Sequence, residues 1–189
     1  MIRIGCTTFS EHGRLVDRKS SKLFEYARYF PIVELDTTYH FLPKEKDVRN
    51  WLTQVPDNFR FVLKVHQSIT TQGALPEGMT LEESLQRFKE AIAPMVDAGK
   101  LFCLLAQFPN QFKCTKQHVA YLGQVRNWFP EYPLAIELRD HSWYQPAVYS
   151  SMIDFMKERQ LSLVVVDQPK RLSTTIPLDL TVTNPAFAL

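Results

Sequence analysis

The stretch LAIELRDHSW, at residues 134–143, joins an apolar run to a charged and aromatic end. The apolar part is typical of a buried strand. Glu137 and Arg139 lie two residues apart, so on an extended strand their side chains point the same way. Two charged side chains on one side of a buried strand rarely stay unpaired, because burying an isolated charge is costly. Either they pair with each other, or they face a polar cavity that something else enters.

The composition is that of a globular protein with a sizeable core. The chain has 189 residues, 45% of them hydrophobic, and this length suits one large domain. A net charge of +2 is too small to indicate a nucleic-acid or membrane footprint by itself. The three cysteines, Cys6, Cys103 and Cys114, form no CxxC pair, which favours reduced thiols. Because we see neither a signal peptide nor a bilayer-length apolar stretch, we expect a cytoplasmic protein without a membrane partner.

Short apolar runs alternate along the chain with segments of helical periodicity. Continuous apolar strands that alternate with helices predict a parallel sheet covered by helices. No linker or repeat divides the pattern, so we expect one domain over residues 1–189. Pro94 is expected to bend or interrupt the helix that starts at the capping box after Thr80. The expected strands cover residues 2–5, 32–35, 61–65, 101–108, 134–138 and 163–166, and the expected helices begin near residues 20, 43, 80, 116 and 146.

Two architectures fit this pattern, an open doubly wound sheet and a closed barrel. A dinucleotide-binding sheet needs a glycine-rich first turn, and the segment GCTT at residues 5–8 is not G-x-G-x-x-G. Polar residues recur instead at the ends of nearly all the strands, which is where a (β/α)8 barrel places its active site. We therefore expect an α/β, TIM-barrel-like parallel barrel.

The strand ends define the candidate site. Several unrelated strands that deliver charges to one face are hard to explain by stability, because desolvation costs on the order of several kcal/mol per charge. Cationic side chains among them can hold an anion, and carboxylates can act as acid and base or ligate a hard cation. The residues are Glu34, Asp36, Lys64, His66, Gln107, Glu137, Arg139 and Asp167.

Each of these residues also has a structural interpretation. Glu137 and Arg139 can form an ion pair at a barrel rim, and Lys64 can simply offset a neighbouring carboxylate. The histidines His40, His66 and His141 are more often packing residues than ligands. Tyr39 and Trp143 belong either to a stacking surface over the site or to loop packing. The carboxylates with His66 weakly indicate a divalent metal, but the interleaved cations argue against it, so no metal ligand or cofactor is assigned.

Several segments resemble the YecE-like family, a domain of unknown function. The resemblance runs through the whole chain in the family's order, and the segment E-x-R-x-x-S-W is fairly specific. It implies a TIM-barrel-like fold with a polar pocket at the carboxyl ends of the strands, and no established reaction. The matching segments are VELDTTY at residues 33–39, LP at 42–43, FRF at 59–61, KV at 64–65, QFP at 107–109 with Phe112, ELR at 137–139, HSW at 141–143 and DQP at 167–169.

The chain departs from the family pattern in two places. The family usually carries a tryptophan in the first loop, where this chain has Cys6-Thr7-Thr8-Phe9. The family also continues with a seventh strand, of which residues 185–189 resemble the beginning, and with an eighth. The resemblance therefore implies a barrel incomplete at its C-terminal end, with about six to seven strands. An open edge of this kind pairs readily with another chain, so we expect self-association.

The leading hypothesis is an enzyme, or former enzyme, that binds a small anionic metabolite, phosphorylated or carboxylated, at the barrel mouth. Its reaction is unknown. The expected catalytic residues are Glu34, Lys64, Glu137 and Asp167, and the expected substrate-binding residues are Tyr39, Gln107, Arg139, His141 and Trp143. One alternative is a nucleic-acid-binding protein in which cationic loop residues contact phosphates and Phe9, Tyr39 and Trp143 stack on bases. Another is a non-catalytic fragment whose strand-end charges form structural ion pairs.

Overall fold

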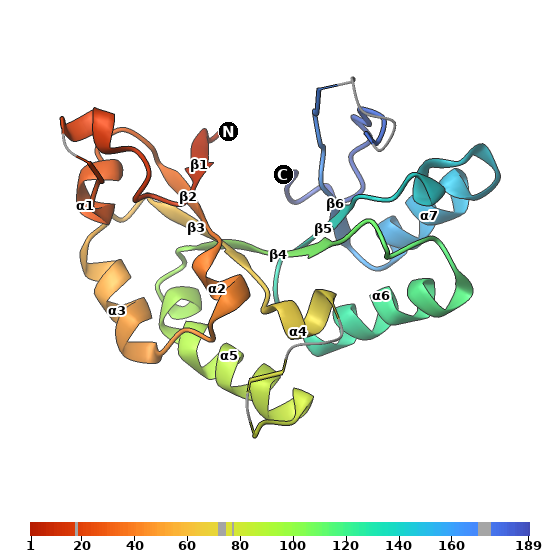
Figure 1. Ribbon diagram of the computed structural model, residues 1–189, viewed down its shortest axis with the longest axis horizontal. Coiled ribbons are helices and arrows are strands. Elements are labelled where there is room, and N and C mark those ends of the chain that lie inside the picture. Colours follow the sequence, from red (N-terminus) through yellow and green to blue (C-terminus); the bar gives the residue numbers. More distant parts are fainter. Residues whose placement is uncertain (18, 72–74, 77, 170–174) are drawn as a thin grey trace. The chain divides into compact units, whose positions relative to one another are not determined.

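The computed structural model describes residues 1–189 except 18, 72–74, 77 and 170–174 (Figure 1). In the described residues six strands belong to one sheet, in the order β1-β2-β3-β4-β5-β6, so each strand pairs with its neighbour in sequence. The β1–β2, β2–β3 and β5–β6 pairs are parallel. The strands are β1 (Gly5–Thr7), β2 (Ile32–Leu35), β3 (Arg60–Lys64), β4 (Leu101–Phe108), β5 (Leu134–Leu138) and β6 (Leu161–Leu163).

This topology confirms the predicted α/β, TIM-barrel-like class. Sequential parallel strands joined through helices are the arrangement of a (β/α) barrel, whereas a doubly wound sheet changes direction at a switch point. The sheet is not closed, since β1 and β6 are its two ends in the described residues. The sixth strand begins two residues earlier than expected, and the first begins three residues later.

Helices connect the strands largely where the sequence indicates. The short helices α2 and α4 directly follow β2 and β3 and were not expected. Of the two effects predicted for Pro94, the interruption is wrong and the bend stays a prediction: α5 continues through this buried proline, and Gly99 follows its end with φ +62°. The helices are α1 (Leu23–Tyr26), α2 (Thr37–His40), α3 (Glu45–Thr53), α4 (Gln67–Thr70), α5 (Leu81–Asp97), α6 (Lys116–Trp128) and α7 (Pro146–Glu158), with 3-10 helices η1 (Gly13–Val16) and η2 (His141–Tyr144).

The chain divides into two compact units. Unit 1 comprises Met1–Ser68 and Gly73–Leu104, and unit 2 comprises Ile69–Gln72 and Leu105–Leu189. The boundary between Leu104 and Leu105 falls within β4. The expectation of a single domain stays a prediction.

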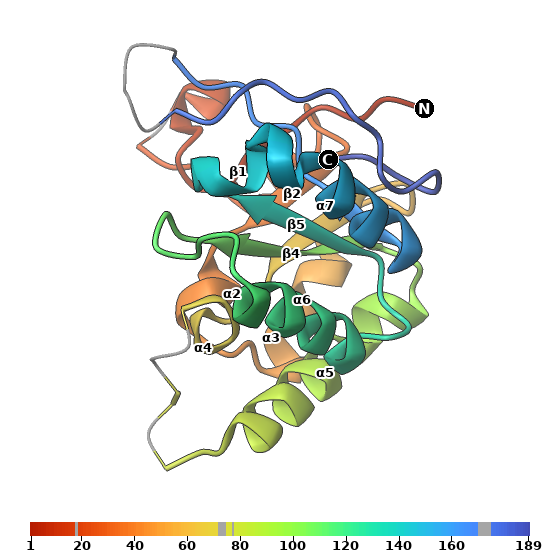
Figure 2. The same ribbon diagram turned by 90° about the vertical axis from the view of Figure 1, so that its right-hand side faces the viewer.

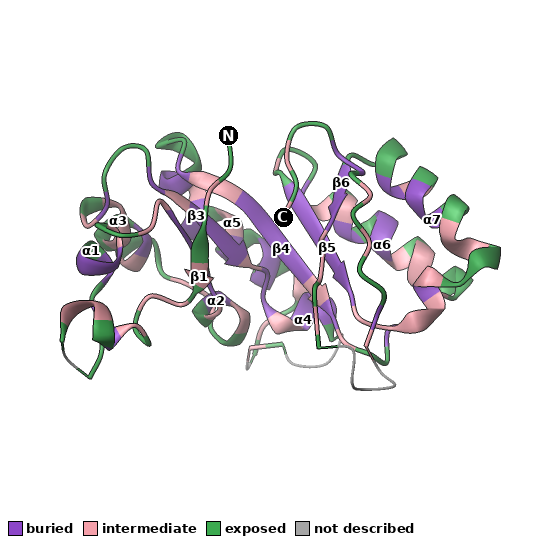
Figure 3. Ribbon diagram, turned by 90° about the horizontal axis from the view of Figure 1, so that it is seen from above, coloured by how far each residue is buried: buried purple, intermediate pink, exposed green. Residues whose placement is uncertain are grey.

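Unit 1 is built on the parallel strands β1, β2 and β3, with α3 packed against α5. Most of β3 is buried (Figure 3). Tyr26 connects the first two strands, because its hydroxyl accepts a hydrogen bond from Cys6 N (2.7 Å) and donates one to Ile32 O (2.9 Å). Burial raises the pKa of this phenol well above its ordinary value. Gly5 is required where β1 meets β2, since a Cβ there would lie 2.1 Å from Ile32 O.

Unit 2 is built on β5 and β6, with α6 and α7 beside them (Figure 2). Every residue of β5 is buried, as the apolar run predicts. After β6 the chain returns to the free side of this strand. Leu163 N donates to Thr183 Oγ1 (2.7 Å), and Val165 N donates to Leu189 O (2.9 Å). Residues 183–189 therefore run beside β6 in the same direction, although no strand is formed there.

No helix in the described part of the chain is long and apolar enough to cross a membrane.

Candidate functional site

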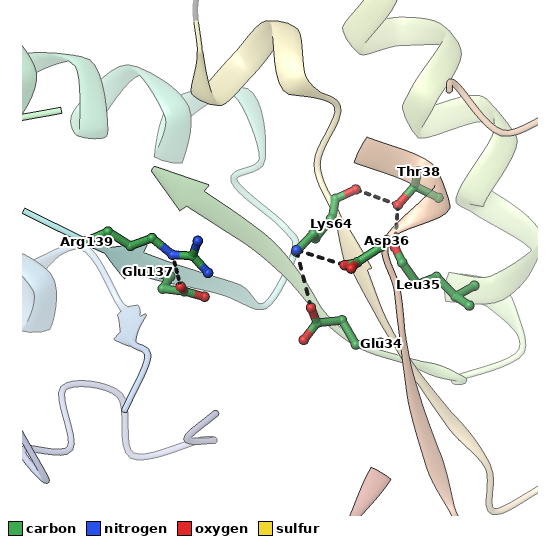
Figure 4. Close-up of polar contacts among 7 residues, drawn as sticks. All are labelled: Glu34, Leu35, Asp36, Thr38, Lys64, Glu137 and Arg139. Atoms are coloured by element: carbon green, nitrogen blue, oxygen red, sulfur yellow. Dashed lines mark hydrogen bonds and ion pairs between the residues drawn. The ribbon is translucent and has the colours of Figure 1, made fainter. Parts of the chain in front are cut away.

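The end of β2 and the end of β3 bring a cation and two carboxylates together in unit 1. Lys64 Nζ lies 2.8 Å from Asp36 Oδ1 and 3.7 Å from Glu34 Oε1 (Figure 4). Both strands are parallel and adjacent, so side chains at their carboxyl ends reach each other directly. The hydroxyl of Thr38 lies 3.0 Å from Leu35 O and 2.6 Å from Lys64 O, which fixes the start of α2 on the end of β3.

This lysine cluster of Glu34, Asp36 and Lys64 favours charge pairing over anion binding. It contains one more carboxylate than ammonium group, and an incoming anion would compete with both carboxylates for Lys64. The Tyr39 ring lies 6.0 Å from Lys64 Nζ and adds a further attraction for the cation. The structure thus brings together Glu34, Lys64 and Tyr39 among the expected site residues. In this arrangement the ammonium group of Lys64 is paired with the carboxylates of Asp36 and Glu34.

His66, directly after β3, is a packing residue. It is buried, its Nδ1 accepts a hydrogen bond from Ser68 N (3.2 Å), and Ser68 Oγ lies 2.9 Å from the same nitrogen. Burial lowers the pKa of the imidazole below its ordinary value, against a smaller opposing effect of a hydrogen bond to the His40 backbone. The ring therefore acts as a neutral acceptor at the start of α4.

The charged pair at the end of β5, in unit 2, is arranged differently. Arg139 Nε donates to Glu137 Oε1 at 2.6 Å (Figure 4). The side chain of Glu137 is 10% exposed and that of Arg139 is 39% exposed, so a nearly buried carboxylate holds a more accessible guanidinium. Neither terminal amino group of Arg139 has a hydrogen-bond partner among the described residues. Arg139 is thus oriented by one bond while the rest of its guanidinium stays available.

Beyond β5 and β6, several polar side chains surround a cavity of about 650 Å³ in unit 2. His141 and Asp167, both expected site residues, line it. Tyr144 also lines it, and its hydroxyl donates to Leu138 O (3.1 Å). Burial raises the pKa of Tyr144 far above its ordinary value, and the charges of Asp179 and Glu137 add to the effect. The remaining lining residues are Gln145, Gln168, Thr175, Ile176, Pro177 and Leu178.

These further lining residues were not expected from the sequence. Gln168 could have been predicted from the sequence, because it follows Asp167 in the DQP segment after the last strand. Residues 175–178 gave no local signal, since only the return of the chain past η2 brings them to this cavity.

Trp143 packs in the core of unit 2. The sequence places it among the substrate-binding residues, but its side chain is buried with 1% of its surface exposed. Its indole Nε1 donates to Phe112 O (2.6 Å), and its ring stacks on that of Phe112 at 5.7 Å. The indole is a core side chain of unit 2, because η2 turns it inward. Gln107, the penultimate residue of β4, is half-buried and does not line the cavity.

A second hollow of about 520 Å³ lies between α6 and α7 and is mainly apolar. It contains none of the charged strand-end residues. Within the described residues no three His, Cys, Asp or Glu side chains are placed to hold a metal ion.

Sequential parallel strands with charged groups at their carboxyl ends place the chain in the class of (β/α)-barrel-like proteins. Residues 3–189 match the family described as "Protein of unknown function DUF72", and the chain belongs to this family. Both the YecE-like resemblance and the fold that it implies are thereby confirmed.

Two curated relatives are UPF0759 proteins. The chain is 32% identical over 189 residues to the protein YunF of Bacillus subtilis, covering 97% of this chain and 67% of that protein. It is 43% identical over 75 residues to the protein YecE of Escherichia coli K12, covering 40% of this chain and 27% of YecE.

Solved structures of the family have the same fold. A DUF72 family protein of Enterococcus faecalis V583 (EF0366) superposes with a TM-score of 0.93 at 47% identity, covering 98% of this chain and 68% of that one. A DUF72 family protein of Thermotoga maritima MSB8 (TM1631) has a TM-score of 0.77 at 30% identity, covering 97% and 71%.

Proposed function

We propose that this protein binds a small anionic metabolite, phosphorylated or carboxylated, at the carboxyl end of β5, with Arg139 as the anion-binding residue. The observation that carries the proposal is that this guanidinium is only partly hydrogen-bonded within the described residues. Glu137 holds Nε at 2.6 Å, and neither terminal amino group has a partner among the described residues.

Such an arginine is prepared for an anion. A planar guanidinium can bind a carboxylate or phosphate through two parallel hydrogen bonds. Holding Nε in advance removes part of the side-chain entropy that binding otherwise costs. Glu137 then acts as a positioning residue. Lys64, the other cation among the strand-end residues, is paired with Asp36 and Glu34 and belongs to the lysine cluster.

The test is an Arg139→Lys substitution, with ligand binding followed by thermal shift and calorimetry. The panel contains inorganic phosphate, small phosphate esters, small carboxylates and a single-stranded oligonucleotide. Because lysine cannot reproduce the planar fork, we expect Arg139→Lys to fold normally and to lose roughly tenfold or more in affinity for the small anions.

The matched control is Arg49→Lys, the same substitution at an exposed ion pair with Glu45 on α3. It should leave anion binding unchanged. Unaltered binding by Arg139→Lys, or no binding of any small anion to the original protein, would overturn the proposal. If Arg139→Lys unfolds, the residue is mainly the partner of Glu137. Stabilisation by the oligonucleotide alone would favour the nucleic-acid alternative.

A further inference from the structure

The cavity of about 650 Å³ beyond β5 and β6 is lined by polar side chains, several of which can form further hydrogen bonds. Asp167 is exposed and Gln168 is half-buried, and neither side chain has a hydrogen-bond partner among the described residues. His141 Nε2 is shielded from solvent and also lacks a partner there. A ligand that displaces the water around these groups can form hydrogen bonds with them.

The charges of the lining residues limit what that molecule is. The cavity contains one carboxylate, Asp167, and no lysine or arginine among its described lining residues. The described lining residues therefore offer an anionic group no cationic partner. The other polar groups that line it include the amides of Gln145 and Gln168 and the hydroxyl of Thr175. Gln145 Nε2 donates to His141 O (3.3 Å) and Thr175 Oγ1 donates to Pro169 O (3.1 Å), and their oxygens can still accept hydrogen bonds.

We infer that the ligand of this site is a polyhydroxylated anion, a sugar phosphate or sugar acid, whose hydroxyl groups bind in this cavity while its anionic group binds Arg139. The inference rests on the proposed function. Sugar hydroxyls both donate and accept, so they match amide and carboxylate side chains, which offer two adjacent polar atoms. The apolar side chains of Ile176, Pro177 and Leu178 add a wall against which the C–H groups of a sugar can pack.

The two halves of such a ligand are close enough to be held together. Arg139 and His141 are two residues apart, so their Cα atoms lie within about 7 Å of each other. A monosaccharide with a terminal phosphate or carboxylate is long enough to reach both. The phenol of Tyr144, fixed by its hydrogen bond to Leu138 O, forms part of the same wall.

The experiment compares pairs of probes that carry the same charge and differ in hydroxyl groups. Ribose 5-phosphate is compared with propyl phosphate, and gluconate with hexanoate, by calorimetry on the full chain. We expect at least one hydroxylated probe to bind about tenfold or more tightly than its partner, because a ligand without hydroxyl groups would remove these polar side chains from water and leave them unpaired. Free ribose tests the cavity without the anion.

Two substitutions separate the contributions. Gln168→Leu should reduce the preference for the hydroxylated probe severalfold while leaving propyl phosphate unaffected, and Gln124→Leu, at an exposed position on α6, should change neither. Arg139→Lys should weaken both phosphates alike.

The outcomes distinguish the inference from the function on which it rests. Equal binding of ribose 5-phosphate and propyl phosphate, and of gluconate and hexanoate, in an Arg139-dependent manner, would overturn the inference and leave the proposed function standing. Ribose binding as tightly as ribose 5-phosphate would overturn the role of Arg139. The absence of binding by all probes would overturn both. A preference that survives Gln168→Leu would overturn the assignment of the hydroxyl groups to this cavity.

Discussion

Lys64 and Arg139 lie at similar positions but differ in how many of their nitrogens are paired with carboxylates. Both lie at the carboxyl end of a buried parallel strand and beside a carboxylate. Lys64 Nζ is a single compact charge, and Asp36 at 2.8 Å with Glu34 at 3.7 Å occupies it from two sides. Arg139 has three nitrogens, and Glu137 engages only one of them. Because the guanidinium has three nitrogens, its two terminal amino groups remain able to bind a ligand.

Two glycines allow a matched test of close packing. Gly5→Ala should destabilise the protein by at least about 2 kcal/mol, because its Cβ would lie 2.1 Å from the backbone oxygen of Ile32. Gly123→Ala should be neutral or stabilising by up to about 1 kcal/mol. A Cβ at this position would lie 3.7 Å from Arg159 Nη1, which is an ordinary contact, and alanine is the better helix former. Urea unfolding measures both, and equal effects would contradict the β1–β2 register.

His66 should make stability depend on pH. Its folded pKa lies below its unfolded value of about 6.5, so the unfolded chain binds more protons as the pH falls through that value. The free energy of unfolding should therefore fall between pH 7.5 and 5.5 and level off below the folded pKa. His66→Asn retains an acceptor for Ser68 N and should show a smaller decrease over this range. Urea unfolding at several pH values compares the two, and parallel curves would refute the assignment.

At the level of elements, hydrogen-bonded caps define where α5 and α6 begin. Thr80 Oγ1 accepts from Glu83 N at the start of α5, and Glu83 Oε2 accepts from Thr80 N in return (3.2 and 2.8 Å). Thr115 Oγ1 accepts from His118 N (3.2 Å) at the start of α6. The N-terminal amide groups of a helix otherwise lack partners, so these threonines fix the first turns.

Removing either cap should lower the free energy of unfolding by a similar amount. We expect Thr80→Ala and Thr115→Ala each to lower the free energy of unfolding by about 0.5–2 kcal/mol. Thr80→Ser and Thr115→Ser retain the hydroxyl and should recover most of the loss. Chemical denaturation measures all four variants. A loss below about 0.3 kcal/mol for both alanine variants would show that the caps contribute little beyond tertiary packing.

At the level of the whole molecule, the chain after residue 174 decides what covers β6. Backbone groups alternate in direction along β6 and the two residues after it, and Val164 N donates to Ile136 O while Leu163 N and Val165 N point the other way. Thr183 and Leu189 accept those two bonds, so part of this edge is occupied by the chain itself. Self-association through that edge, expected from the sequence, stays a prediction, and it requires this segment to move.

Thr183→Ala tests this arrangement. Thr183 is buried, accepts from Leu163 N (2.7 Å) and donates to Leu161 O (2.8 Å). Its loss leaves buried backbone groups unpaired, which should cost about 1–3 kcal/mol. Light scattering should then show more association than in the original protein at equal concentration, because an exposed strand edge pairs readily.

Val182→Ala, at an exposed neighbouring position, is the control and should leave both stability and association unchanged. Normal stability and scattering in Thr183→Ala would mean that residues 183–189 do not protect this edge.

The sequence alone determined the order and most of the positions of the strands and long helices, together with the polar character of the strand ends. Apolar runs and helical periodicity are local, and they require only that one face of each element be buried. The 101–108 strand and the helix from residue 146 were predictable for this reason. The short helices α2 and α4 were not, because their single turns depend on the strand ends that they cover.

Only the tertiary structure decided which charges stay available. The pairing of Lys64 with Glu34 and Asp36, the inward turn of Trp143 onto Phe112, and the approach of residues 175–178 to the cavity each join residues separated by long stretches of chain. The composition of a strand end shows that charge is present. Whether that charge is occupied depends on which distant side chain the packing places beside it.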